Sequence, residues 1–433
     1  MTTPTSVTLP SHPQRIALHN EVHARPPQAM QAPLMLTHLV LVCDAAQRAA
    51  SRQHLNQLLR DHHQPSADDD ASHLRADLGT FQLRWELHTE FVTWTFHAPL
   101  NLLREDGAAL PTARDLVPQA WLAGLPGVML SGLHVWVVGE FSSVPPLAPQ
   151  VLLREDTLVA ARVSDGGAEV HTDFALHADG FGRLLLTVRA LTPRRLGRLV
   201  QRLLEIETYR MTALLGLPVA RAAAPLLAQA EQELSELAGA IRSARADEEP
   251  QLLDRLTRLA GLVESHHAAT HARFSASAAY FELMDQRIVA IREQALPGMQ
   301  TVGQFVERRL TPARNTCDWV TRRQSALSQR IARISNLLRT RVEIEQQQSS
   351  QALLATMTHR QELQLKLQAT VEGLSVAAIT YYIVGLISYL AKGLGKLGWP
   401  WSAEATAAVS IPLVALAVWW SLRRLHRSLF QHP

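Results

Sequence analysis

The sequence predicts an α+β chain: an N-terminal mixed α/β domain, a region of long helices, and two C-terminal transmembrane helices. Three observations support this fold class. Between Pro33 and Leu191 the hydrophobic pattern switches repeatedly between a period of two and a period of three to four residues. From Thr192 onward the strand patterns stop and long helical patterns follow. Near the end, Gly373–Ala391 and Ala405–Leu422 are uncharged and apolar, and at about 1.5 Å per residue each can cross roughly 30 Å of hydrocarbon.

Composition and charge narrow the class of protein. The chain has 433 residues and a formal net charge of only +3, spread evenly, which argues against nucleic acid as a partner. Residues 1–370 have ordinary globular composition and are long enough for one or two domains. Cys43 and Cys317 are far apart and neither has a CxxC partner, so we expect two reduced thiols rather than a disulfide or a zinc site.

Residues 1–32 form a predicted N-terminal arm. Met1–Arg15 lacks the apolar segment of a signal peptide, so we expect the large N-terminal part to stay in the cytoplasm. The arm then places four ionisable side chains within seven residues: His19, Glu21, His23 and Arg25. On a helix the two histidines would share a face and suit zinc or another borderline metal. The alternative is structural, with the charged pair of Glu21 and Arg25 fixing the arm to the domain.

Residues 33–191 form the predicted cytosolic α/β domain. Leu34–Cys43 is a nearly continuous apolar run typical of a buried strand, and Ala45–Leu59 has a helical pattern. Apolar and polar residues alternate on both sides of Thr89-Glu90, so Thr80–His97 is predicted to be a β-hairpin. Further strands are predicted at Leu133–Val138, Thr157–Val163, Ala168–Phe174 and Arg183–Leu191. We expect a sheet of about six or seven strands with helices on at least one face.

Residues 192–370 form a predicted stalk of long helices. Thr192-Pro193 is a helix start, and that helix is expected to pass possible kinks at Pro218 and Pro225 and reach about Ala244. A second helix is expected over Asp247–Leu296. Thr311-Pro312 repeats the start signal, and no proline follows before Pro400 and no glycine before Gly373. One helix of about 80 residues is therefore expected to continue into the first apolar segment.

An apolar stripe follows this third helix. Leu327, Ile331, Ile334 and Leu338 have coiled-coil spacing, and Leu353, Met357, Leu363 and Leu367 extend the stripe. Two interpretations stay open, because the stripe can pack on the preceding helices of the same chain or between the subunits of a homo-oligomer.

Residues 371–422 form the predicted transmembrane hairpin, and residues 423–433 a basic tail. The cluster Arg423-Arg424-Leu425-His426-Arg427 indicates, by the positive-inside rule, that both chain ends lie in the cytoplasm. The alternative is a buried helical hairpin in a soluble core. In the first apolar helix Tyr381, Gly385 and Ser388 fall at i, i+4 and i+7. Such a small and polar stripe suits either helix packing or the lining of a narrow pore.

Two clusters of histidines and carboxylates are the remaining candidate sites. Glu86, His88 and Glu90 alternate along the predicted hairpin, and Asp173, His177 and Asp179 lie on or beside another strand. If both clusters met the N-terminal arm, they would form a pocket for a divalent cation, or for an anionic ligand paired with Arg25 or Arg183. The alternative is that charges on one strand face simply meet water.

No catalytic motif supports an enzyme. The sequence has no Gly-x-Ser-x-Gly, no HExxH and no phosphate-binding glycine-rich loop before a helix. We therefore expect no enzymatic activity. An enzyme that uses His19, His23 and His88 is kept as a third hypothesis, after a transporter and a scaffold.

Four strings together resemble a known family. They are His19–Pro26 (HNEVHARP), Glu86–Phe91 (ELHTEF), Thr172–Phe174 with His177–Phe181 (TDF, HADGF), and Leu204–Arg210 (LEIETYR). In this order they resemble a bacterial family of uncharacterised membrane-anchored proteins, domain of unknown function 3422, over nearly the whole chain. This resemblance implies anchoring in the bacterial inner membrane as a multi-pass protein, and it implies no activity.

The order of domains also resembles the CorA-type divalent-cation transporters. That resemblance implies a homo-oligomeric funnel in the lipid bilayer, with a Gly-Met-Asn selectivity motif at the outer end of the first membrane helix. Here Tyr389-Leu390-Ala391-Lys392-Gly393 stands in that place, and a lysine at a pore mouth would repel cations. Two functions follow as hypotheses: a CorA-like transporter with a cytosolic ligand- or ion-sensing domain, or a membrane-tethered binding or scaffold module without transport.

Overall fold

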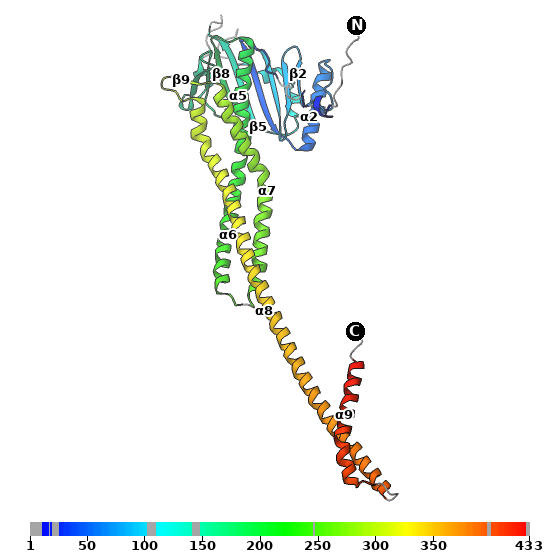
Figure 1. Cartoon of the computed structure of the whole chain (residues 1–433). Coiled ribbons are helices and arrows are strands. Elements are labelled where there is room, and N and C mark those ends of the chain that lie inside the picture. The colour runs from blue at the N-terminus through cyan, green and yellow to red at the C-terminus, as the bar shows by residue number, and fades with distance from the viewer. Residues whose placement is uncertain are drawn as a thin grey trace, which may run out of the picture. The chain divides into compact units, whose positions relative to one another are not determined.

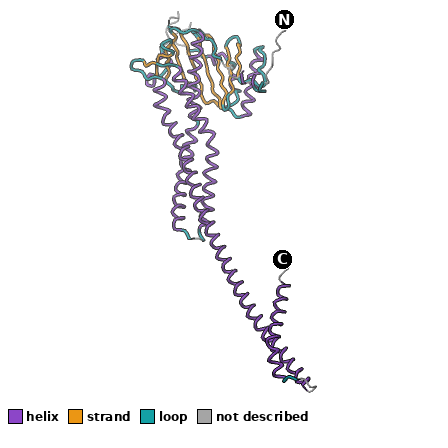
Figure 2. The backbone as a smooth tube through the Cα atoms, in the orientation of Figure 1, coloured by secondary structure: helices purple, strands orange, loops and turns teal. Residues whose placement is uncertain are grey.

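The computed structural model describes residues 11–16, 18–19, 26–101, 110–140, 148–245, 247–395 and 400–429, without the side chains of residues 395 and 425–429. The described residues form one nine-stranded sheet followed by long helices (Figures 1 and 2). This confirms the predicted fold class.

The sheet is mixed, with the strand order β2-β3-β4-β1-β5-β8-β7-β6-β9. The only parallel neighbours among the described strands are β5 and β8, and the other pairs are antiparallel. The strands are β1 (Leu34–Val42), β2 (His73–Asp77), β3 (Gln82–Leu87), β4 (Phe91–Pro99), β5 (Val128–Gly139), β6 (Val159–Val163), β7 (Ala168–Thr172), β8 (Gly182–Val188) and β9 (Gln294–Ala295).

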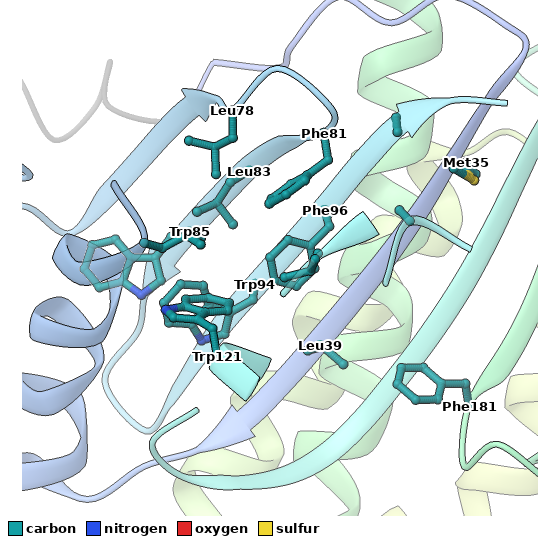
Figure 3. Packing of buried hydrophobic residues seen from close by; sticks show 14 of the residues in the cluster. Met35, Leu39, Leu78, Phe81, Leu83, Trp85, Trp94, Phe96, Trp121 and Phe181 are labelled. Atoms are coloured by element: carbon teal, nitrogen blue, oxygen red, sulfur yellow. The ribbon is translucent and has the colours of Figure 1, made fainter. Parts of the chain in front are cut away.

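One face of the sheet, the α2 face, is covered by α2 (Ala45–Asp61) and α3 (Gln119–Ala123). Its core is aromatic, and Figure 3 shows Trp85 and Trp94 of the hairpin with Trp121 of α3. The α2 helix begins with a capping box, in which Asp44 accepts from the Gln47 backbone N–H and the Gln47 side chain accepts from the Asp44 N–H. Two short 3-10 turns, Ala113–Leu116 and Glu155–Thr157, and α4 (Pro149–Leu152) complete the connections.

The opposite face, the α5 face, is covered by α5 (Pro193–Leu214). Leucines and valines of this helix pack on β5, β6, β7 and β8, together with Ile291 and Val302. Thr192 caps the helix by accepting from the Arg195 N–H, and Pro193 is its first residue, as predicted. The next helix, α6 (Gly216–Ser243), begins after a break at Leu215 and contains Pro225.

Three helices then run side by side: α6, α7 (Glu249–Ala290) and the first part of α8 (Val302–Gly395) (Figure 1). Arg323 of α8 forms a bidentate ion pair with Glu231 of α6, with N–O distances of 2.7 and 2.6 Å. Gln324 of α8 donates to the Thr270 hydroxyl of α7 at 3.0 Å. These contacts hold the bundle together.

Three local expectations were wrong. The sheet has nine strands because β2 and β9 join its edges; β2 is only half-buried and β9 has two residues, so neither has a clear pattern. The second long helix stops at Ala290, because Gln294–Ala295 pairs with β6 instead. Helix α8 begins at Val302, and Pro312 lies inside it. At the start of α8, the Thr301 N–H donates to the Gln304 side chain and the Gln304 N–H donates to the Thr301 hydroxyl. Val306 and Leu310, which lie in the helix before Pro312, are buried.

The chain divides into two compact units. One contains residues 1–242 and 254–334, which are the sheet and most of the helical bundle. The other contains residues 243–253 and 335–433, which are the turn between α6 and α7, the rest of α8, and α9 (Ala403–Leu429). A boundary between the two units therefore falls inside α8.

Among the described residues, three helical stretches are long and apolar enough to cross a membrane, judged by length and composition: Pro193–Ser243, Val302–Leu394 and Ala403–Arg424. The first was not predicted. A third of its most apolar window is buried within the protein, whereas the share is 11% for the second and none for the third. The leucines of α5 are buried against the sheet and are not available to contact lipid. We therefore regard the two C-terminal segments as the candidate membrane helices.

Candidate functional site

A polar cavity of about 240 Å³ lies between the α5 face of the sheet and helices α5 and α7. Strands β1, β3 and β4 form one wall, and the two helices form the other. The lining residues are His38, Arg84, Glu86, His88, Thr93, Thr95, Gln201, Leu204, Glu205, Thr208, Tyr209 and Arg287.

The sheet side of the cavity wall is formed by alternate side chains of β3 and β4. In β3, Leu83 and Trp85 belong to the core of the α2 face, so Arg84 and Glu86 point to the opposite side. In β4, Trp94 is buried in that same core while its neighbours Thr93 and Thr95 line the cavity. One strand pair thus builds an apolar core on one face and a polar wall on the other.

The hydrogen bonds of His38 define its tautomer. The Thr208 hydroxyl donates to the Leu204 carbonyl at 2.9 Å, so its oxygen accepts from His38 Nε2–H, also at 2.9 Å. His38 Nδ1 then accepts from the Thr95 hydroxyl at 2.8 Å. Burial lowers the pKa of His38 from 6.5 to about 4. This neutral imidazole joins β1, β4 and α5 and is not a base at neutral pH.

Two ion pairs face each other across the cavity. On the sheet side Arg84 donates to Glu86 at 2.7 Å. On the helix side Arg287 of α7 pairs with Glu205 of α5. All four side chains are at least two-thirds buried. The formal charges of these two guanidinium groups and two carboxylates sum to zero among the described lining residues.

Two buried polar atoms of the cavity wall have no hydrogen-bond partner among the described residues. They are the Thr93 hydroxyl and the Gln201 carbonyl oxygen. The Gln201 amide nitrogen donates to Glu205 at 2.8 Å, which turns the carbonyl oxygen away from that carboxylate. An unsatisfied buried polar group costs about 1–3 kcal/mol, so such atoms point to a ligand or to bound water.

The predicted hairpin cluster is only partly one site. Glu86 of β3 and His88, which follows the strand, both line the cavity, so these polar side chains do not simply meet water. Glu90 lies in the turn before β4, where it accepts from Arg273 at 2.8 Å and from the Tyr280 hydroxyl at 3.1 Å. Burial and the Glu90 carboxylate raise the pKa of Tyr280. Glu90 therefore attaches the hairpin to α7.

The second predicted cluster, beside β7 and β8, fixes a loop. Asp173 is buried and accepts from His177 Nε2 at 2.9 Å, the Arg154 N–H at 2.9 Å and the Ala175 N–H at 3.0 Å. Asp179 lies 3.6 Å from Arg183. Five strand spacings separate β3 from β7, which is about 24 Å. The hypothesis that both clusters converge on one pocket is wrong, because this strand order keeps them apart.

The N-terminal arm gives little to the described site. His19 is exposed in a short helical stretch, and Glu21, His23 and Arg25 lie outside the described residues. Within the part of the chain that the structure describes, no three His, Cys, Asp or Glu side chains are grouped to hold a metal ion. The predicted divalent-cation site has no support there.

The small and polar stripe of α8 is partly covered by the described chain. Tyr381 is 77% exposed, and Gly385 and Ser388 are half-buried. The most buried residues of this segment are Thr380 and Ala391. The stripe therefore stays a prediction for contact with another subunit or with a water path.

Sequence reasoning missed the helical half of the cavity. Gln201, Glu205 and Thr208 fall at i, i+4 and i+7 of α5, a polar stripe beside its leucines, and this signal was available. Arg287 comes from α7, 82 residues after Glu205, and no local signal identifies it.

A family model described as "Protein of unknown function (DUF3422)" matches residues 10–429. No curated protein and no solved structure matches the chain. Within the structure, two of the strings on which the resemblance rested meet at one place: Glu86 and His88 of one, and Glu205, Thr208 and Tyr209 of the other, line the same cavity.

Proposed function

The chain belongs to the DUF3422 family, and from this premise we propose that it is a membrane-anchored protein whose cytosolic α/β domain binds a small polar ligand between the sheet and α5. The observation that carries the proposal is the polar cavity itself. A protein interior normally satisfies its buried polar atoms, yet two wall atoms here have no partner among the described residues.

The bonding of His38, the size of the cavity and the make-up of its wall support binding rather than catalysis. His38 is neutral and engaged at both ring nitrogens. The cavity, at about 240 Å³, is slightly smaller than most ligand sites, and its wall consists of two helices and a sheet. Ligand contacts to Glu205 or Arg287 would act directly on how α5 and α7 lie against the sheet.

Membrane anchoring rests on the two C-terminal apolar segments. Both are long enough to span a bilayer, and Arg423 and Arg424 follow the second. The proposal places both chain ends in the cytoplasm of a bacterial cell, with the protein in the inner membrane. Cysteine labelling of the connection between α8 and α9 from outside intact cells tests this topology, and labelling only after lysis contradicts it.

The binding function can be tested without knowing the ligand. Full-length protein in detergent is incubated with the small-molecule fraction of a bacterial extract, washed and denatured, and the released molecules are identified by mass spectrometry. We expect at least one polar molecule to be enriched in the wild type and lost in Gln201→Met. Gln232→Met is the matched control, since Gln232 makes the same i, i+4 contact to Glu236 on the exposed side of α6. If no molecule is enriched, the proposed function is wrong.

A transporter of CorA-like architecture is the second candidate. It is favoured by the continuity of α8, which begins in the core beneath α5 and extends without interruption through the first apolar segment. The apolar stripe of α8 divides in two: Leu327, Ile331 and Leu338 are buried within the chain, whereas the second half is between 47% and 67% exposed, and for this second half packing between subunits is the better interpretation (Leu353, Met357, Leu363 and Leu367). The missing Gly-Met-Asn motif weighs against the known cation selectivity.

Two measurements separate the candidates. Native mass spectrometry in lipid nanodiscs gives the number of subunits, and liposomes loaded with an ion-sensitive dye report flux. An oligomer with flux supports the transporter. A monomer, or an oligomer without flux, leaves a membrane-tethered binding or scaffold module.

A further inference from the structure

We infer that the cavity beneath α5 binds a small zwitterion, such as a free α-amino acid. This inference rests on the proposed binding function and names the chemical class of the ligand. Three properties of the cavity carry it: the balance of charge, the kinds of unsatisfied atoms, and the size.

The charge balance of the described lining residues disfavours ligands with a net charge. Arg84, Glu86, Glu205 and Arg287 are mostly buried, and their charges cancel. An anion or a cation would bring an uncompensated charge into a poorly solvated space, which is costly. A molecule that carries one positive and one negative group keeps the balance and can join both Arg–Glu pairs.

The polar atoms match the two ends of such a molecule. An ammonium group has three N–H donors, and the Gln201 carbonyl oxygen is a buried acceptor on the same amide whose nitrogen donates to Glu205. A carboxylate needs donors, and the Arg84 guanidinium, which donates to Glu86 through one terminal nitrogen, carries further N–H groups. Thr93 lines the cavity and is 3% exposed, and its hydroxyl, which has no partner among the described residues, can serve either end.

The size limits the ligand further. A volume of about 240 Å³ corresponds to about eight water molecules of liquid. A free amino acid fits this space, whereas a nucleotide or a peptide does not. Leu204 and the Tyr209 ring give the wall an apolar part for a short side chain.

The test uses the full-length protein in detergent. The melting temperature is measured with each of the twenty free amino acids at millimolar concentration, and affinities of those that stabilise are measured by calorimetry. We expect at least one to raise the melting temperature, since a ligand of the native state stabilises it. Its N-acetyl form and its amide form each lose one charge, and each should bind at least about tenfold more weakly.

Two variants locate the site. Thr93→Val keeps the shape of the side chain and removes the hydroxyl, so it should weaken binding at least about tenfold while the protein without ligand stays as stable as the wild type. Gln201→Met should weaken binding similarly, and Gln232→Met should not; this pair keeps the test decisive if Thr93→Val fails to fold.

Three outcomes overturn the inference: no free amino acid binds, the blocked forms bind as well as the free one, or Gln201→Met binds like the wild type. If the extract experiment still enriches another molecule, the proposed binding function stands and only the zwitterion class is wrong.

Discussion

The two faces of the sheet use alternate residues of the same strands for opposite purposes. On the α2 face, Trp85 and Trp94 are fully buried among apolar neighbours. On the α5 face, the next residues, Arg84, Glu86 and Thr93, line a polar cavity. The α2 face stabilises the fold by excluding water, whereas the α5 face surrounds a cavity with charged and polar groups. Both faces hold a buried polar atom without a partner among the described residues, Trp94 Nε1 on the α2 face and the Thr93 hydroxyl on the α5 face, but of these two it is Thr93 that lines the cavity. The difference therefore points to the α5 face as the functional one.

The largest expected effect comes from the α2 face. Trp94 is 0% exposed and packs edge-on against Trp121 at 5.2 Å. Trp94→Ala would leave a large cavity, and we expect a loss of about 3–5 kcal/mol in the free energy of unfolding, measured by chemical denaturation. Trp319→Ala, at a half-exposed position of α8, should cost far less. Equal costs would contradict the claim that this face holds the fold together.

The second effect is a dependence of stability on pH. Burial lowers the pKa of His38 to about 4, below the value of 6.5 of an exposed histidine. Between these values the unfolded chain binds a proton that the folded chain does not, so the free energy of unfolding falls as the pH falls from 6.5 to 4. The full contribution is about 3 kcal/mol and is present above pH 6.5.

His38→Gln tests this effect. The variant should be less stable than the wild type at pH 7, and the difference should shrink toward pH 5, as measured by urea denaturation at both values. His359→Gln, on the exposed surface of α8, is the control and should show no such change. A difference that stays constant with pH would show that His38 is not held neutral.

The third effect concerns the ion pair between Glu205 and Arg287, which joins α5 and α7 at the cavity. In a double-mutant cycle with Glu205→Gln and Arg287→Met, we expect a coupling free energy of about 1 kcal/mol, because the pair is mostly shielded from water. The exposed pair of Asp254 and Arg258 should give less than about 0.5 kcal/mol. Equal couplings would mean that the cavity wall behaves like ordinary surface.

Much of the fold could be predicted because its signals are local. The alternation around Phe81–Phe96 identified both the hairpin and its buried side, and Thr192-Pro193 marked the start of α5. Pro312 misled because the buried residues before it support α8 across the proline. Such support comes from packing and is invisible in a local pattern.

Only the sheet side of the site could be predicted from the sequence. Glu86 and His88 were identified as candidates, but the partners that enclose them come from α5 and α7. The strand order decided the rest: four strands lie between β3 and β7, so the cluster of Asp173, His177 and Asp179 is remote from the cavity. No spacing in the sequence encodes that order.

The smallest expected effect is the sharpest test of the difference between the faces. Replacing a buried threonine by valine usually removes a hydrogen bond and destabilises, but the Thr93 hydroxyl has no partner among the described residues. Thr93→Val should therefore leave the free energy of unfolding unchanged or raise it by up to about 1 kcal/mol when no ligand is present. Thr37→Val on the α2 face is the matched control, because the Thr37 hydroxyl is bonded to His134 at 2.9 Å and to the Arg114 N–H at 3.1 Å, and it should destabilise. If Thr93→Val destabilises the protein as much as Thr37→Val does, the Thr93 hydroxyl already has a hydrogen-bond partner in the free protein. It would then not be available to a ligand.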